Sequence, residues 1–206
     1  LVEPSCTPSR AALMTGQYSI RNGLSLFIIP GTPNTLPGTA YTMGTLFKDT
    51  GHAPALFGEW HLGIEPQSVP TAHGFDTFSG IPPDSSWSDA TTVPGMVRTQ
   101  SAGDVPEKVL LEKGPWIMEQ QSGGPLNRVK PFTMEVRAEI DNELTERSVA
   151  FIKTNAAADK PFFLYLPFSV GHGPNLPSKA FEGKSRVGNY GDKIMESDYH
   201  VGGVLD

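Results

Sequence analysis

The chain has 206 residues, of which 38% are hydrophobic and 18% are charged, and its formal net charge is −6. These values are typical of one globular domain with a sizeable core, and the acidic balance argues against a nucleic-acid-binding protein, which would need a basic face. No run of roughly eighteen apolar residues occurs, so the sequence predicts no membrane span. Its single cysteine excludes an internal disulfide bond.

The first predicted element is a short helix that begins near Cys6. Pro8 suits a first helical turn because its missing N–H would have no partner there, and Gly16 is a natural terminator. Arg10 follows Cys6 by four residues, on the same face of the helix. A side chain at Cys6 would therefore meet backbone N–H groups, the helix dipole and a guanidinium group, which together favour an anion. The alternative is that Cys6 is a small buried side chain and Arg10 a surface charge.

Patterns of apolar residues predict the remaining regular elements. Thr42 should cap a helix that ends at Gly51, and residues 53–57 should form a short buried strand. The second half of the chain predicts a helix, a continuous apolar strand of the central parallel type and a final helix, over residues 139–155, 162–166 and 190–206. This order predicts a layered α/β fold with a parallel sheet.

Residues 66–137 show no sustained period and mix proline, glycine and serine with short apolar segments. We interpret them as a loop-rich insertion whose loops and small strands lie above the sheet. The insertion either shapes a substrate pocket or is a plain surface feature.

Two histidines follow predicted strands. His61 comes shortly after the strand over residues 53–57, and His172 comes after the strand over residues 162–166. Because ligands of open α/β sheets bind at the carboxyl ends of the strands, both histidines are candidate functional residues. The alternative for each is a loop histidine whose hydrogen bonds are satisfied locally.

The residues around these positions resemble the type I sulfatases. Residues 6–10 read Cys-Thr-Pro-Ser-Arg and are followed by Leu-x-Thr-Gly, which closely resembles the first signature of that family. Residues 58–63 resemble the second signature, usually Gly-Lys-Trp-His-Leu-Gly, and His172 before Gly-Pro is similar to the family histidine that contacts sulfate. Residues 189–205 resemble the helix that follows, so the likeness runs through the chain and is most similar to bacterial arylsulfatases.

The resemblance implies a fold and an activity. The fold would be alkaline-phosphatase-like, a doubly wound mixed sheet with helices on both faces, incomplete here because residues 1–206 would be the central part of one catalytic domain. The activity would be hydrolysis of a small-molecule or sugar sulfate ester. The whole enzyme would be periplasmic or secreted, and the fragment alone would be inactive. A phosphomonoester or phosphonate ester hydrolase of the same superfamily is the close alternative.

Carried over by position, the family roles fall on four residues. Cys6 would be oxidised by the formylglycine-generating enzyme to formylglycine, whose hydrated aldehyde is the nucleophile and a metal ligand. Arg10 would stabilise this hydrate, His61 would bind it and accept its proton, and His172 would hold the sulfate and assist the leaving group. The metal implied by the family is calcium, which prefers oxygen ligands.

Glu59 departs from the family pattern. It stands where the family has a lysine that contacts both the nucleophile and the sulfate, and a reversed charge beside a dianionic transition state should cost several kcal/mol. Glu59 therefore keeps open a non-catalytic relative that binds anionic sugars. A further alternative is a thiol enzyme that uses unmodified Cys6 with His61 as its base.

A second departure concerns the metal. The family supplies paired aspartates upstream of the cysteine and an Asp-Asn pair from a later strand, and no segment of this chain matches either. Because calcium takes six or more oxygen ligands, we expect the remaining ligands to lie outside this fragment.

Overall fold

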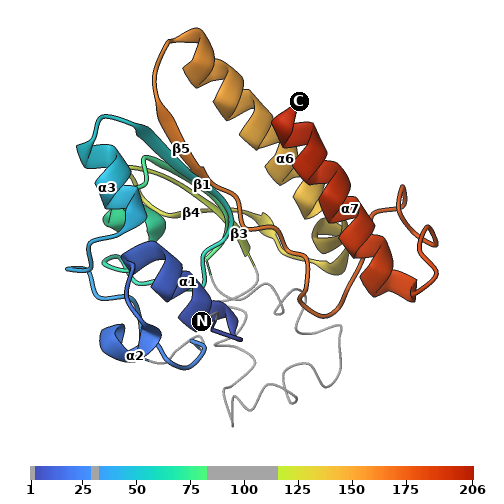
Figure 1. Ribbon diagram of the computed structural model, residues 1–206, viewed down its shortest axis with the longest axis horizontal. Coiled ribbons are helices and arrows are strands. Elements are labelled where there is room, and N and C mark those ends of the chain that lie inside the picture. Colours follow the sequence, from blue (N-terminus) through green and yellow to red (C-terminus); the bar gives the residue numbers. More distant parts are fainter. Residues whose placement is uncertain (1–2, 29–32, 83–115) are drawn as a thin grey trace.

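The computed structural model describes residues 3–28, 33–82 and 116–206. Five described strands form one mixed sheet in the order β4-β3-β2-β1-β5 (Figure 1). β1 pairs in parallel with β2 and with β5, whereas β3 is antiparallel to both β2 and β4. The predicted parallel sheet is confirmed for three strands and is extended by an antiparallel pair. The strands are β1 (Ala53–Glu59), β2 (Thr77–Ile81), β3 (Trp116–Gln121), β4 (Asn127–Pro131) and β5 (Phe162–Tyr165).

Helices cover both faces of this sheet, as predicted. α1 and α3 lie on one side, and α6 lies on the opposite side with α7 packed beside it (Figure 1). None of the helices that the structure describes is long and apolar enough to cross a membrane. The described helices are α1 (Cys6–Thr15), α2 (Ser19–Asn22), α3 (Met43–Asp49), η1 (Pro70–His73), α6 (Met134–Ala157) and α7 (Gly188–Leu205).

The core divides into two clusters because neighbouring side chains of a strand point to opposite faces. Leu56 of β1 packs in one cluster with Met14 of α1, and Trp60 belongs to the same cluster. Phe57 packs in the other cluster with Ile140 of α6. β1 is buried on both faces along its whole length, which fixes the strand end where the candidate residues begin.

Capping and terminating residues in the sequence predicted the ends of two helices correctly. Gly16 ends α1 with φ 66°, and its N–H donates to Ala12 O. Thr42 caps α3, since its side chain accepts a hydrogen bond from Thr45 N at 3.2 Å. α6 begins before the predicted residue 139, because Thr133 caps it by accepting from Val136 N at 3.3 Å.

Two expectations about the sheet are wrong. Within residues 66–137, the described strands β2, β3 and β4 belong to the sheet instead of lying above it, because β2 pairs directly with β1. The rest of the expected insertion, residues 83–115, lies outside the described residues. β5 was expected to be central, but among the described strands it pairs only with β1 and its residues are half-buried.

Candidate anion site

The carboxyl ends of β1 and β5 lie side by side because the two strands are parallel neighbours. Glu59 N at the end of β1 donates to Pro167 O at 3.1 Å, which joins the two segments beyond the strands. Gly58 permits this approach: its φ is 132°, and a Cβ there would lie 2.1 Å from Pro167 O. The local sequence therefore brings the segments that carry His61 and His172 together.

The Glu59 carboxylate lies at the centre of the predicted site residues. It is fully buried, and its Oε1 lies 3.0 Å from Arg10 Nη2. The same oxygen lies 3.6 Å from His61 Nδ1 and 3.6 Å from His172 Nε2. Arg10 also donates through Nη1 to the Glu59 carbonyl oxygen. Residues from α1, from the end of β1 and from the loop after β5 thus meet at one carboxylate oxygen.

The surroundings of Glu59 keep it ionised. Burial raises the pKa of this carboxyl, but the Arg10 guanidinium, a hydrogen bond from His61 and the charges of His172 and His61 together hold the pKa well below its usual value of 4.5. The carboxylate is an internal anion that lies among Arg10, His61 and His172. By the resemblance, Arg10 and His61 contact the nucleophile and His172 contacts the sulfate.

His61 is held on several sides. Its backbone has φ 54°, an uncommon value outside glycine. Its N–H donates to Pro82 O at 3.0 Å, and its carbonyl oxygen accepts from Thr7 Oγ1 at 3.2 Å. Nε2 lies 2.9 Å from Ile28 O, and because a carbonyl only accepts, Nε2 carries the hydrogen. Nδ1 faces Glu59, so the hydrogen of the protonated ring that points at this carboxylate is the one on Nδ1, and Nδ1 can accept a proton only after that hydrogen has left.

Cys6 is the first residue of α1 and is partly exposed. Its N-cap Ser5 makes no side-chain capping hydrogen bond. Thr7, the next residue after Cys6, is fully buried and joins this helix end to His61 through the hydrogen bond described above. The predicted helix start at Cys6, with Arg10 one turn further on, is confirmed, and both belong to the same neighbourhood as His61.

Sequence reasoning missed Tyr165, the last residue of β5. Burial raises the pKa of its hydroxyl, while Arg10 lowers this pKa and Glu59 raises it, so the side chain stands beside the same charges. It also missed Arg137 and Asp141 of α6, which are buried next to the loop that carries His172. A signal existed, because both polar residues fall within the stripe that buries Ile140.

The predicted calcium has no full set of ligands in the described part of the chain. Residues 3–28, 33–82 and 116–206 contain no group of three or more histidine, cysteine, aspartate or glutamate side chains that could hold a metal ion. The side chains around Glu59 are mainly nitrogen donors that carry or can carry positive charge, which does not suit a hard cation.

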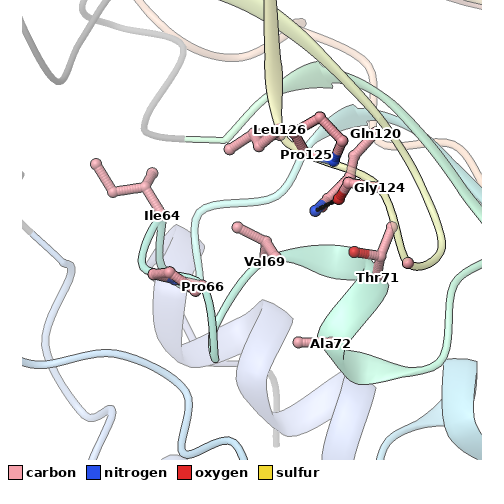
Figure 2. A pocket seen from close by; sticks show the side chains of 10 residues that line it. Ile64, Pro66, Val69, Thr71, Ala72, Gln120, Gly124, Pro125 and Leu126 are labelled. Carbon is pink, nitrogen blue, oxygen red and sulfur yellow. Dashed lines mark hydrogen bonds between the residues drawn. The ribbon is translucent and has the colours of Figure 1, made fainter.

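A separate hollow of about 470 Å³ lies beside η1 and the turn between β3 and β4. Figure 2 shows that apolar side chains such as Val69 and Leu126 form much of its wall. No residue of the candidate site lines it, so it is not part of the anion site. Its lining residues are Ile64, Pro66, Val69, Thr71, Ala72, Gln120, Gly123, Gly124, Pro125 and Leu126.

The fold and the site define an α/β protein whose candidate site residues gather at the carboxyl ends of parallel strands, where ligands of this architecture bind. A family model described as Sulfatase matches residues 2–206. The chain belongs to the sulfatase family, and its fold is the alkaline-phosphatase-like fold that was predicted.

Individual relatives agree with this assignment. N-acetylgalactosamine-6-sulfatase of Mus musculus is 31% identical over 210 residues, covering 98% of this chain and 37% of the relative. Steryl-sulfatase of Homo sapiens is 31% identical over 255 residues, which cover 98% of this chain and 43% of that relative. The crystal structure of PsFucS1 sulfatase from Pseudoalteromonas sp. superposes with a TM-score of 0.86 at 28% identity, covering 99% of this chain and 42% of that one. The chain thus spans about two fifths of the length of these proteins. The predicted bacterial arylsulfatase branch stays a prediction.

Proposed function

We propose that the protein that carries this chain hydrolyses sulfate esters, and that this chain supplies the nucleophile and the side chains that hold the sulfate. The observation that supports it is the convergence of Arg10, His61 and His172 on one carboxylate oxygen, at 3.0, 3.6 and 3.6 Å. Three such groups around one point suit a tetrahedral anion, and they lie beside the helix end that carries Cys6.

The proposed reaction begins with maturation of Cys6 by the formylglycine-generating enzyme, in which molecular oxygen and a two-electron reductant convert the thiol-bearing carbon to an aldehyde and release hydrogen sulfide and water. Water adds to this aldehyde. One hydroxyl of the hydrate then loses its proton to a solvent water and attacks the substrate sulfur, while the bond from sulfur to the alcohol oxygen breaks. His172 gives the leaving oxygen its proton. His61 then takes the proton of the second hydroxyl at Nδ1, the carbon–oxygen bond to sulfate breaks, and the aldehyde re-forms. The net change is addition of one water to the ester.

The substrate is proposed to be a small-molecule or sugar sulfate ester, since two relatives are named for sulfates of an amino sugar and of steroids. Calcium remains part of this proposal, with ligands beyond the residues described above. A periplasmic or secreted location also remains a proposal that follows from the family.

Glu59 favours a second candidate function. Its carboxylate occupies the point between Arg10, His61 and His172, so in this sequence an internal anion stands where the sulfate would be held. A relative that binds anionic sugars without turning them over would tolerate this arrangement, whereas an efficient sulfatase would lose transition-state stabilisation. Binding of a sulfated sugar without hydrolysis would support this second candidate.

The test is the fate of Cys6 and the turnover of an aryl sulfate. The protein that carries this chain should be produced in cells with the formylglycine-generating enzyme, and the mass of its tryptic peptide ending at Arg10 measured. We expect this peptide to have lost its sulfur and gained an aldehyde, and we expect release of 4-nitrophenol from 4-nitrophenyl sulfate. The Cys6→Ala variant is the control and should show neither.

The outcomes separate the candidates. An intact thiol together with no turnover would contradict the sulfatase proposal and leave the binding function. An intact thiol that iodoacetamide alkylates, with turnover lost on alkylation, would instead support the thiol enzyme with His61 as base.

A further inference from the structure

The loop that carries His172, here called the histidine loop and comprising residues 167–178, is held by buried side chains of α6 and α7. Arg137 of α6 is only 2% exposed. Its Nε donates to Pro174 O at 2.8 Å, and its Nη2 donates to His172 O at 2.8 Å. One planar guanidinium group therefore binds two carbonyl oxygens on either side of Gly173, one of them belonging to His172 itself.

A second set of buried charges fixes the two ends of the histidine loop. At the first end, Asp141 of α6 accepts from Ser169 N and from Ser169 Oγ, each at 2.9 Å. At the far end, Glu196 of α7 accepts from Ser178 N at 3.3 Å. Lys193 joins the two carboxylates, since its Nζ lies 3.0 Å from Asp141 and 2.9 Å from Glu196.

Burying these charged side chains costs desolvation free energy, so their role is better explained by the geometry that they select than by stability. Buried charges add little net stability compared with well-packed apolar residues, but a fully hydrogen-bonded set of them selects one geometry. Arginine suits this task, because its fork of donors is rigid and two bonds to the main chain restrict both position and rotation. The His172 side chain is 24% exposed, so apolar packing alone does not fix it.

We propose that Arg137 is a positioning residue for His172, and that Asp141, Lys193 and Glu196 hold the ends of the histidine loop so that Arg137 can act. The effect on catalysis rests on the proposed function, in which His172 protonates the leaving group. The effect on the loop does not rest on it. Loss of Arg137 lets the His172 backbone rotate, and its imidazole then leaves the point that it shares with Glu59.

The experiment compares two arginine variants of the same helix. Arg137→Gln removes the guanidinium, and Arg147→Gln is the matched control, because Arg147 is a more exposed α6 residue that pairs with Glu119. Amide hydrogen exchange is measured over residues 169–178, and kcat and KM are measured on phenyl sulfate and on 4-nitrophenyl sulfate. Nitrophenolate needs less protonation as it leaves, so it depends less on His172.

We expect Arg137→Gln to accelerate exchange in the histidine loop at least tenfold. We also expect kcat for phenyl sulfate to fall at least tenfold more than kcat for 4-nitrophenyl sulfate. Arg147→Gln should change neither quantity. Should Arg137→Gln fail to fold, Arg137→Lys decides, because it keeps the charge but offers one donor centre, and it should give smaller changes of the same kind.

Equal exchange rates in the Arg137 and Arg147 variants would overturn the inference. An equal loss of kcat on both substrates would also overturn it, since a purely structural role of Arg137 predicts no dependence on the leaving group. If the unchanged protein turns over neither ester, the proposed function fails, and the exchange rates alone decide whether Arg137 positions the loop.

Discussion

The segments after β1 and after β5 each present a histidine to Glu59, but they are held in different ways. His61 is anchored by main-chain hydrogen bonds that continue the sheet and by a helix residue, Thr7. His172 is anchored by charged side chains of α6 and α7, with Arg137 bound to its carbonyl oxygen. One segment is an extension of the core, and the other is a loop held from outside the sheet.

The difference shows how one fold holds a fully buried histidine and a partly exposed histidine beside the same carboxylate. The segment after β1 is buried on all sides, so backbone hydrogen bonds and apolar contacts suffice to hold it. The histidine loop is partly exposed, and a partly exposed loop needs specific side-chain partners to keep one conformation. Mutations should therefore separate the two segments, and Glu59, which contacts both histidines, should affect both.

The largest effect is expected for Glu59→Lys. Removing one partner of a buried ion pair costs about 3–5 kcal/mol, and the new cation adds repulsion with Arg10. The free energy of unfolding should fall by at least that amount without an anion, while sulfate at about 100 times its Kd should restore about 3 kcal/mol. If the carried-over role is right, turnover of 4-nitrophenyl sulfate should rise roughly a hundredfold or more.

Glu59→Gln is the matched control, because it removes the carboxylate charge without adding a cation. It should be destabilised too, but sulfate should restore less of its stability than in Glu59→Lys. Denaturant unfolding with and without sulfate measures both values. If sulfate stabilises the unchanged protein and Glu59→Lys equally, Glu59 does not occupy an anion site. If Glu59→Lys does not raise turnover, the family role of a lysine at position 59 does not apply to this protein.

The next effect concerns only the histidine loop and depends on pH. Burial raises the pKa of Glu196, but hydrogen bonds from His200, Ser178 and Lys193 and the charge of Lys193 lower it from its usual 4.5 to about 2. This shift predicts a contribution to the free energy of unfolding of up to about 3 kcal/mol, which is fully present above pH 4.5 and is lost as the pH falls toward 2. Glu196→Gln should remove this part of the acid sensitivity.

Denaturant unfolding between pH 5 and pH 2 measures this contribution. Glu146→Gln, an exposed glutamate of α6, is the control and should leave the pH dependence unchanged. The same slope in Glu196→Gln and in the unchanged protein would mean that other carboxyl groups carry the acid sensitivity, Asp192 among them, whose pKa is lowered chiefly by a backbone hydrogen bond from Ser185.

The smallest effect should fall on the segment after β1. Thr7→Val keeps the shape of the side chain but removes its hydroxyl, which donates to His61 O and accepts from Ile28 N. Two buried main-chain groups lose a partner, so the free energy of unfolding should fall by about 2 kcal/mol. Thr154→Val is the control, because that hydroxyl is exposed and bonds only within its own helix. If Thr7→Val is as stable as this control, the hydrogen bonds of the Thr7 hydroxyl, which connect α1 to His61, do not contribute to stability.

Part of the site could be predicted from local patterns. The helix that begins at Cys6 and ends at Gly16, the strand before Glu59 and the strand before His172 all follow from residues close in sequence. Since parallel strands end at the same edge of a sheet, placing His61 near His172 needed only the order of the elements. These predictions depend on backbone propensity and apolar period, which a short stretch of sequence contains.

What remained hidden depends on partners far along the chain. The membership of β2, β3 and β4 in the sheet is decided by pairing across many residues, and short segments of mixed composition do not reveal their partners. Arg137 and Asp141 fall in the apolar stripe of α6, but their spacing of four residues is also that of an ordinary exposed ion pair, so the pattern by itself does not decide between burial and exposure.

The sequence by itself determined the family motifs, the helix that carries Cys6 and the two strands that end at the candidate histidines. Only the tertiary structure decided that Arg10, His61 and His172 share the Glu59 carboxylate, and that Arg137 and Lys193 are buried beside the histidine loop. The physical reason is that the protonation state and burial of a charged side chain depend on which distant charges and donors surround it. A strand or a helix cap is specified by its immediate neighbours in the chain.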